Sequence, residues 1–578
     1  MQENQLQAFE PAAKVLAATA MSQTFSFCME RKYLETVNTP NQVCFRLEAR
    51  TGNDLLDAAW LKISQIGKPI DDSAENCFTA IQKILYSCFW PKETQLLFLI
   101  SGDGERNHMY LGIRKSHLST GDVKPSTQIK YLNEFIKGAW PGLNAEVVKE
   151  GDDALHQLQE EIQKDKIEYV KAFTGIPSME SQYKSLYPAT IDMLIAGMNK
   201  SKKYAYLVVA DPLPADDVEQ MLFQCRDMNG QIESLKSINV QESFSQGTSK
   251  NHTISRNVTE TINDTITESI SKKSFSGIGK GAMALTGLGM AASVLPAAGE
   301  ILTGVADVSA SVASAALGLV GFGSIGNAIT NLQPTVTKGT SHSEGRSTSN
   351  GESDSVGSSE NHSQSISRNL VNKHVEAVAE HLYYHSKRFE TGKAIGMWKV
   401  GVYLMANKPA DILNGSMQLR SILSGQESIF EPMRSHDVTE VVEGDIKTKC
   451  LGHFSAPSIT IKSPNGKPFN HPLGAHYADL RSVLTTKELS YLINFPLHSV
   501  PGISVIDSSP EFSLNIANDT KGEHVDFGKL LYGGSVTDMQ YTLPTSLLSK
   551  HTLLSGINGT GKTNTVQAIL NWFIRHFE

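Results

Sequence analysis

The sequence is poor in cysteine and has no excess of basic residues. Its six cysteines among 578 residues are too few for a disulfide scaffold, and the absence of C-x-x-C spacing argues against structural zinc. The net charge of −8 and the pI near 6.1 exclude a chain-wide positive field, so any contact with DNA needs a local patch. The first residues lack the basic and apolar regions of a signal peptide. These absences predict a cytoplasmic protein in a reducing compartment.

The length and composition predict several folded domains. At about 150 residues per domain the prior is about four, and 40% hydrophobic with 19% charged residues excludes global disorder. We expect an α+β multidomain chain, divided as follows: an α/β N-terminal domain (1–150), the two halves of an α+β domain (151–237 and 373–445), an insert rich in Ser, Thr and Gly between them (238–372), a β-rich connecting region (446–545) and the start of a P-loop ATPase domain (546–578).

Local patterns on both sides of the insert predict one domain that the insert interrupts. Two apolar runs, 95–101 and 108–113, flank a glycine turn and predict a hairpin. Before the insert, a strand at 204–210 precedes a helix at 216–235; after it, the pattern predicts a helix from Val375, a strand at 398–405 and a helix at 411–423. This mirrored order predicts that residues 376–425 pack against residues 204–235.

Two smaller groups of residues have a structural and a functional interpretation each. His381 and His385 are spaced i, i+4 on a predicted helix, which would suit a metal site, although a solvated helix face is the favoured interpretation. A basic and aromatic group is interpreted as a strand edge protected by lysines, with single-stranded DNA contact as the alternative: Lys200, Lys202, Lys203, Tyr204 and Tyr206.

The insert carries two arms with a strict period of two. Every odd position from 243 to 271 is small and polar, and every odd position from 341 to 369 is Ser, Gly or Asn. This period is typical of strands. If the arms form an antiparallel hairpin, the expected register places Ser243 opposite Asn369. Three interpretations of the insert remain: disorder, long helices, or a β-stem assembled from hairpins of several copies, because one long two-stranded ribbon is not stable alone.

Between the arms, residues 277–335 form an apolar tip. Two uncharged stretches rich in Ala, Gly and Leu, 281–299 and 308–337, are each close to or above the ~20 residues that cross a bilayer, and Glu300 and Asp307 lie between them. The tip therefore predicts either membrane contact or a pair of helices packed within a soluble assembly.

The most specific motif is a phosphate-binding loop near the C-terminus. Residues 556–563, Gly-Ile-Asn-Gly-Thr-Gly-Lys-Thr, fit G-x-x-x-x-G-K-[ST] at every fixed position. A short strand is expected just upstream at 551–555, and an amphipathic helix downstream with Val566, Ile569, Leu570, Phe573 and Phe577 on its apolar face.

The motif assigns roles to named residues. We expect Lys562 to reach the β- and γ-phosphates of ATP and the Thr563 hydroxyl to bind Mg²⁺. No residue follows Glu578 to supply the acidic strand that completes such a site, so the chain is expected to be the N-terminal part of a longer ATPase. The predicted cofactor-binding residues are Gly556, Asn558, Gly559, Thr560, Gly561, Lys562, Thr563 and Asn564.

The sequence around this loop resembles that of HerA/FtsK-like ring ATPases, including VirB4-like conjugation ATPases. The resemblance covers residues 480–578 and lies in the loop and helix start 559–566, in 484–489 (LTTKEL), in Phe495-Pro496, in 500–502 (VPG) and in 527–531 (FGKLL). It implies a homo-oligomeric ring, a hexamer, that translocates DNA or protein with ATP and Mg²⁺. The insert is a departure from that pattern.

The insert supports a second interpretation from a different functional class. In it, the chain is a pore- or channel-forming assembly component, in an anti-phage defence or secretion system, whose hairpins form a β-stem. The leading prediction is the N-terminal portion of an ATP-driven translocase, associated with a membrane through its insert.

Overall fold

The structure of the chain is a computed structural model. It describes residues 22–246, 362–507 and 524–577 apart from short gaps at 23–24, 38–44, 51–57, 69–73, 123, 141, 150–151, 165, 179–190, 200, 202, 234–235, 463–468, 533–534, 549, 551–552, 557–558 and 560. The apolar tip 277–335 and most of both arms therefore lie outside the described residues.

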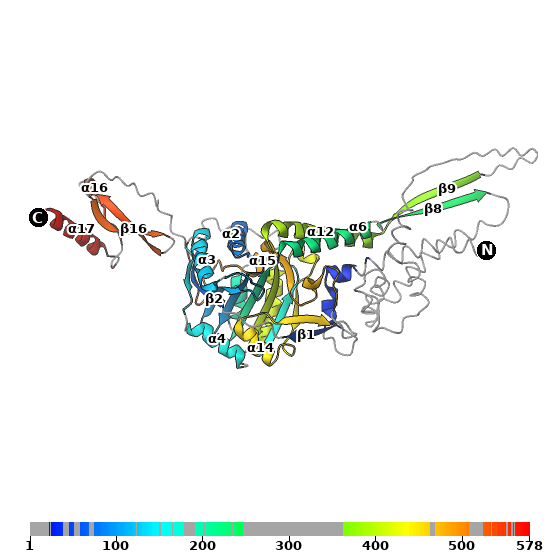
Figure 1. Ribbon diagram of the computed structural model, residues 1–578, viewed down its shortest axis with the longest axis horizontal. Coiled ribbons are helices and arrows are strands. Elements are labelled where there is room, and N and C mark those ends of the chain that lie inside the picture. Colours follow the sequence, from blue (N-terminus) through cyan, green and yellow to red (C-terminus); the bar gives the residue numbers. More distant parts are fainter. Residues whose placement is uncertain are drawn as a thin grey trace, which may run out of the picture.

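A ten-stranded sheet forms the centre of the described main body (Figure 1). All neighbouring strands pair antiparallel except β14 and β2, which are parallel. The strand path runs β11 (Arg434–Asp437), β6 (Tyr169–Thr174), β10 (Met397–Ala406), β7 (Tyr204–Pro212), β3 (Thr94–Gly102), β4 (Asn107–Lys115), β2 (Ala58–Lys68) and β14 (Ser504–Asp507), while β13 (Ser482–Thr485) pairs with β10 and β5 (Asn144–Val147) pairs with β2.

Helices cover both faces of this sheet, which is why its central strands are apolar without interruption. Alternate residues of β3 and β7 enter opposite cores: Leu97 and Leu207 belong to one, Phe98 and Val208 to the other. The first core also contains residues of α4 (Asp153–Gln163), α6 (Ala215–Glu233) and α12 (Lys373–Ile395). The second contains residues of α2 (Ala74–Ser87), α3 (Pro125–Ala139), α5 (Ile191–Met198), α13 (Pro409–Leu423) and α15 (Thr486–Leu492).

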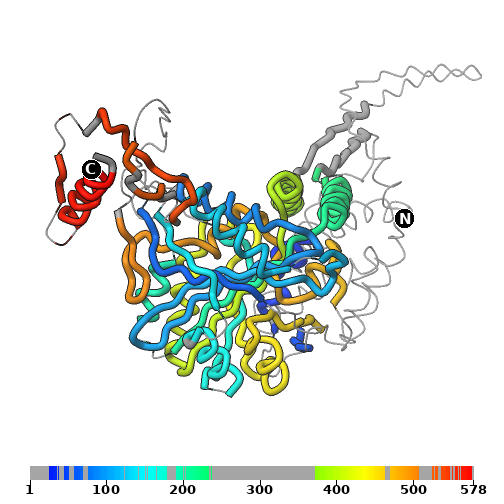
Figure 2. Tube along the Cα trace, turned by 60° about the vertical axis from the view of Figure 1, so that its left-hand side comes forward, coloured from blue at the N-terminus to red at the C-terminus, as the bar shows by residue number. Residues whose placement is uncertain are grey.

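The two segments that flank the insert pack together, as the mirrored pattern predicts. Strand β10 pairs with β7 from Trp398↔Pro212 to Ala406↔Tyr204. Helices α6 and α12 lie side by side on one face of the sheet (Figure 2). They are joined by Cys225, whose thiol donates to the Leu382 carbonyl at 3.2 Å, and by the Arg226–Glu390 ion pair at 2.7 Å. The insert is therefore an excursion from one continuous core.

That core extends further along the chain than the expected domain division. Strands β2 to β5 precede residue 150 and β6, β7 and β10 follow it, yet all belong to one sheet. Residues 446–507, expected as connecting structure, also contribute β13, β14 and α15 to this body, and β12 (Ser458–Lys462) pairs with β1 (Arg46–Arg50). The expected division differs from the structure because strands that are far apart in the sequence hydrogen-bond to one another in this sheet, and local patterns do not indicate such pairing. The structure is mixed α/β.

The beginning and end of the insert form a two-stranded ribbon. Strand β8 (Ser237–Gln246) pairs antiparallel with β9 (His362–Val371), which confirms strand structure for these parts of the arms. Odd residues lie opposite odd residues, as expected, but the expected register is wrong: Ser243 pairs with Ser365 and not with Asn369. The pairing begins with Ser237 opposite Val371, next to the hydrogen bond that the Asn372 amide donates to the Lys236 carbonyl.

The C-terminal elements stand apart from the main sheet in Figure 1. Strands β15 (His524–Tyr532) and β16 (Ser535–Pro544) form a hairpin, followed by α16 (Thr545–Leu548) and α17 (Lys562–Phe577). Among all the described residues, none of the helices combines the length and the apolar character needed to cross a bilayer.

Candidate nucleotide-binding loop

The predicted phosphate loop leads directly into α17. Gly556, Gly559 and Gly561 are described, and helix α17 begins at Lys562. Thr563 and Asn564 lie exposed in its first turn. Two predicted ligands, Asn558 and Thr560, lie outside the described residues. The order of glycine loop followed by helix therefore agrees with the motif, with the lysine and threonine at the helix start.

Two glycines give the loop its backbone shape. Gly559 has φ +89° and Gly561 has φ +82°, values that residues with a Cβ rarely adopt. A Cβ at either position would meet no atom within 4 Å, so the backbone conformation and not crowding requires glycine here. Consecutive amides in such turns can point into one concave space, which is the property that phosphate-binding loops use.

The charge of Lys562 lies over this loop. Its Nζ donates to the Gly556 carbonyl at 2.5 Å, so the side chain turns back across the loop instead of extending into solvent. The first helical hydrogen bond of α17 runs from Thr565 N–H to Gly561 C=O at 3.0 Å. The amides of Thr563 and Asn564 thus precede the helical ladder, at the end of the helix where the macrodipole favours an anion. Loop, ammonium group and helix start together suit a polyphosphate.

The upstream strand expected at 551–555 is wrong for the described part of it. Residues 553–555 have no regular structure, and Leu553 is 90% exposed. A strand needs a neighbour for its hydrogen bonds, and the hairpin β15–β16 pairs only with itself in the described chain.

Helix α17 confirms the downstream prediction, but part of its apolar face is in solvent. Val566, Leu570 and Ile574, one turn apart, are 40%, 53% and 55% exposed. This stripe is available for packing against a further surface.

The two weaker groups have structural roles. Strand β7 lies between β3 and β10, so the interpretation of Tyr204 and Tyr206 as part of a strand edge is wrong. Tyr204 and Tyr206 are buried, and Lys203 is paired with Glu161. The other two lysines of this group, Lys200 and Lys202, lie outside the described residues. The solvated helix face expected for His385 is also wrong, because His385 is fully buried with Nδ1 3.2 Å from Arg388 Nη1. No cluster of three metal-binding side chains occurs among the described residues.

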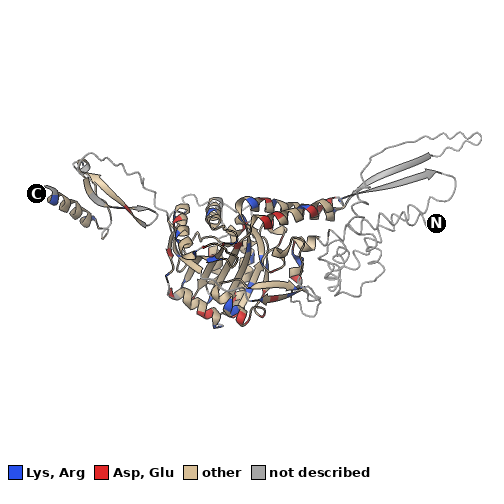
Figure 3. Ribbon diagram, viewed as in Figure 1, with Lys and Arg blue, Asp and Glu red and all other residues tan. Residues whose placement is uncertain are grey.

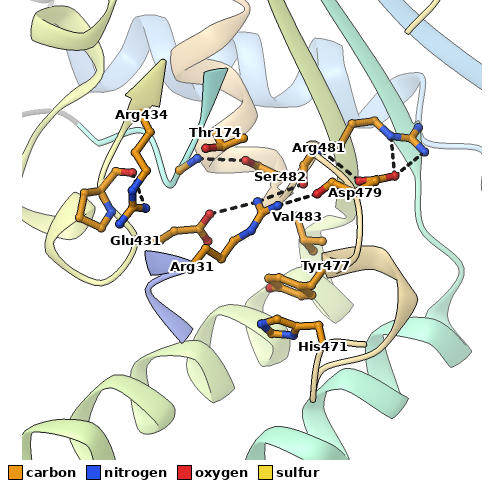
Figure 4. A network of polar contacts seen from close by, with 12 residues as sticks. Arg31, Thr174, Glu431, Arg434, His471, Tyr477, Asp479, Arg481, Ser482 and Val483 are labelled. Atoms are coloured by element: carbon orange, nitrogen blue, oxygen red, sulfur yellow. Dashed lines mark hydrogen bonds and ion pairs between the residues drawn. The ribbon is translucent and has the colours of Figure 1, made fainter. Parts of the chain in front are cut away.

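A buried polar network holds the segment around Arg31 against the rest of the core (Figure 4). The sequence did not indicate this network. Arg31, fully buried, donates to the backbone carbonyls of Asp479 at 2.6 Å and Arg481 at 3.1 Å, and lies 3.3 Å from Glu431. Burial lowers its pKa, but the Tyr33 hydroxyl and the Glu431 carboxylate outweigh that effect, so the pKa lies above its ordinary value. The guanidinium therefore stays charged and ties three distant segments together.

The same network continues to the sheet through Asp479. Its carboxylate lies 2.6 Å from Lys399 Nζ on β10 and 3.0 Å from Arg481 Nη2, and Arg481 also lies 2.7 Å from Asp211 on β7. Burial raises the pKa of Asp479, yet Arg481 and Lys399 hold it below its ordinary value. Each ionised group in this cluster has a counter-charge. The cluster therefore has a structural role, which is to hold the segment 479–481 against strands β7 and β10. No single motif could reveal it, since its members come from residue 31 to residue 481.

Comparisons with known proteins do not identify a family. No family model matches the chain, and no curated protein or solved structure does either.

Proposed function

We propose that the chain binds Mg-ATP through residues 556–564 and is the N-terminal portion of a HerA/FtsK-like ATP-driven translocase that works as a ring of copies. The observation that carries this proposal is the loop itself. Gly559 and Gly561 adopt left-handed backbone conformations immediately before a helix, and Lys562 reaches back across the loop. With Mg-ATP bound, Lys562 would neutralise charge on the β- and γ-phosphates and the Thr563 hydroxyl would hold Mg²⁺.

The described chain supplies the phosphate-binding half of such a site. Loop amides and the lysine bind and orient the phosphates, and the helix start adds favourable partial charge. The bound Mg²⁺ would neutralise developing charge on the phosphates during transfer. DNA or protein as the translocated substrate follows from the resemblance of residues 480–578. Membrane contact through residues 277–335 stays a prediction.

Replacing Lys562 tests the nucleotide proposal. In the natural polypeptide that contains these residues, Lys562→Ala should abolish Mg-ATP binding measured by calorimetry, because the phosphates lose their cation. The matched control is Arg575→Ala, which removes an exposed cation from the other end of the same helix and should leave the affinity unchanged. Equal affinities for Lys562→Ala and the parent would overturn the assignment.

A second candidate function is a channel-forming assembly component whose ribbons build a β-stem. The observation that favours it is the antiparallel pairing of β8 with β9, because it shows that the insert begins and ends as a β-ribbon. In this function the loop would bind nucleotide without driving translocation.

A further inference from the structure

The ribbon β8–β9 is a continuation of the helix pair α6–α12 (Figure 1). At the junction, the Asn372 amide donates to the Lys236 carbonyl at 3.0 Å, and Lys236 Nζ lies 3.8 Å from Glu376 on α12. Asn372 also caps α12, because its Oδ1 accepts from the amides of His374 at 3.1 Å and Val375 at 3.4 Å. Only two undescribed residues, 234–235, separate α6 from this junction.

The helical base of this arm is fixed to the core. Besides the Cys225 and Arg226 contacts, Lys393 on α12 forms an ion pair with Glu219 on α6. Figure 3 shows basic and acidic residues along both helices of the pair. The ribbon therefore leaves the body from a defined position and in a defined register, which gives every copy of the chain the same arm.

Both outer edges of the ribbon are open in the described structure. The pairing runs over ten residue pairs, from Ser237↔Val371 to Gln246↔His362, and no third described strand joins either side. In an antiparallel pair, about half of the backbone N–H and C=O groups of each strand point away from the partner. A two-stranded ribbon is at best marginally stable in water, and its open edges are templates for a further strand.

We propose that these edges are occupied by other copies of the same chain, with β8 of one copy pairing with β9 of the next. This inference rests on the proposed ring of copies and names the surface through which they meet. Antiparallel β9-to-β8 contact preserves the up-and-down alternation that already exists within one ribbon. Each added copy then presents the same open edge, so the contact is heterologous and repeats until the ring closes.

The residue types along β8 and β9 favour a second copy over an unrelated peptide. At the odd register positions both residues are polar in every pair except the first: Asn239 pairs with Asn369, Ser243 with Ser365, and Ser245 with Ser363. At the even positions Ile238 pairs with Leu370. A β8–β9 contact between copies can therefore match the same residue types that already pair within one copy.

Cysteine cross-linking between differently tagged copies tests this contact. The background is Cys44→Ser, because the other five cysteines are buried. One copy of the chain carries a single cysteine on β8, tried in turn at Asn239, Gln241, Ser243 and Ser245, and the other copy carries Ser365→Cys on β9. The copies are co-expressed and oxidised. We expect a product that carries both tags at about twice the 63.0 kDa chain mass, at one or two neighbouring positions of the scan.

Two controls make the outcome decisive. Ser243→Cys with Ser365→Cys in one chain should form an intrachain disulfide, because the two residues face each other in the ribbon. Cysteines placed at Phe223 on α6 and Leu413 on α13, both exposed and away from the ribbon, should give no product with both tags. The contact is overturned if the intrachain disulfide forms while no β8 position cross-links to Ser365→Cys. Adding Lys562→Ala to both copies distinguishes the ribbon contact from the proposed nucleotide binding. This substitution should abolish Mg-ATP binding, whereas the cross-link between the ribbons should still form.

Discussion

At the scale of single residues, the loop depends on backbone conformation at Gly561. A left-handed conformation costs a residue with a Cβ about 1–2 kcal/mol, and Gly561 has φ +82° next to the helix start. Gly561→Ala should therefore weaken Mg-ATP binding by about tenfold, since 1.4 kcal/mol corresponds to a factor of ten. Calorimetry measures the change.

The control for this variant is Gly528→Ala on β15. A Cβ at Gly528 also meets no atom within 4 Å, and the backbone there is not left-handed. Its affinity should equal that of the parent. A Gly561→Ala variant that binds as tightly as Gly528→Ala would show that the loop binds no phosphate in this conformation.

Two buried histidines make stability depend on pH. Burial lowers the pKa of His436 and His471 from 6.5 to about 3. His436 Nε2 lies 2.8 Å from Thr174 Oγ1, and both ring nitrogens of His471 are hydrogen-bonded, to Cys28 O and from Leu473 N–H. Both side chains are therefore neutral in the folded chain, and each takes up a proton on unfolding below pH 6.5.

Because the unfolded chain binds more protons in that range, stability is retained above pH 6.5 and is lost as the pH falls toward 3. Each histidine should reduce the free energy of unfolding by about 1.4 kcal/mol per pH unit below 6.5. Urea titrations of the parent and of His436→Gln between pH 5 and 7.5 measure this. The variant should be less stable at pH 7.5 but lose stability less steeply. Parallel slopes would contradict the neutral state of His436.

At the scale of elements, the positions of those helices and strands that have a clear local sequence pattern could be predicted. The hairpin β3–β4, strands β7 and β10 and helices α6, α12, α13 and α17 all occur where period and turn residues placed them. The order of strands in the sheet could not be predicted, because β3, β7 and β10 are equally apolar on both faces. The predicted register of the ribbon was also wrong. With a period of two, any shift by an even number of residues still places odd residues opposite odd ones, so the pattern does not select one register.

The segment 484–489, at the start of helix α15, has a clear structural role. Residues 484–489 contain a capping box in which Thr485 and Glu488 exchange hydrogen bonds, Glu488 N–H to Thr485 Oγ1 at 3.2 Å and Thr485 N–H to Glu488 Oε2 at 2.9 Å. Arg388 on α12 donates to both Glu488 oxygens at 2.6 and 2.7 Å and to the Val483 carbonyl at 2.8 Å. One carboxylate therefore joins α15, β13 and α12.

Replacing Glu488 by Gln should cost about 3–5 kcal/mol of stability, because it leaves the Arg388 charge buried without a counter-charge. Gln can still complete the capping box, so the loss reports the ion pair. Thr485→Ala, which removes the cap alone, should cost about 1 kcal/mol. Guanidinium unfolding of the two variants measures both. Similar losses for the two would mean that the ion pair contributes little.

At the scale of the whole molecule, one sheet collects strands from residue 58 to residue 507 across a long insert. The candidate site was predictable in its residues, because the phosphate-loop motif is local and its helix is periodic. The buried network around Arg31, Glu431 and Asp479 was not, because its members meet only after the sheet has formed. Local sequence thus indicates elements and loops, while the contacts that join them depend on burial and charge between distant segments.

The insert can be removed at the ribbon if the core is continuous, as the sheet indicates. Gln246 lies opposite His362, the geometry that a two-residue turn closes in a hairpin. Replacing residues 247–361 by Asn-Gly should therefore give a chain that unfolds cooperatively, because β7, β10, α6 and α12 keep every contact. Its melting temperature should lie within a few degrees of the parent's in circular dichroism, and the near-ultraviolet spectrum of the core should be unchanged. Loss of the cooperative transition would mean that residues 247–361 hold the two halves together, contrary to the pairing of β7 with β10.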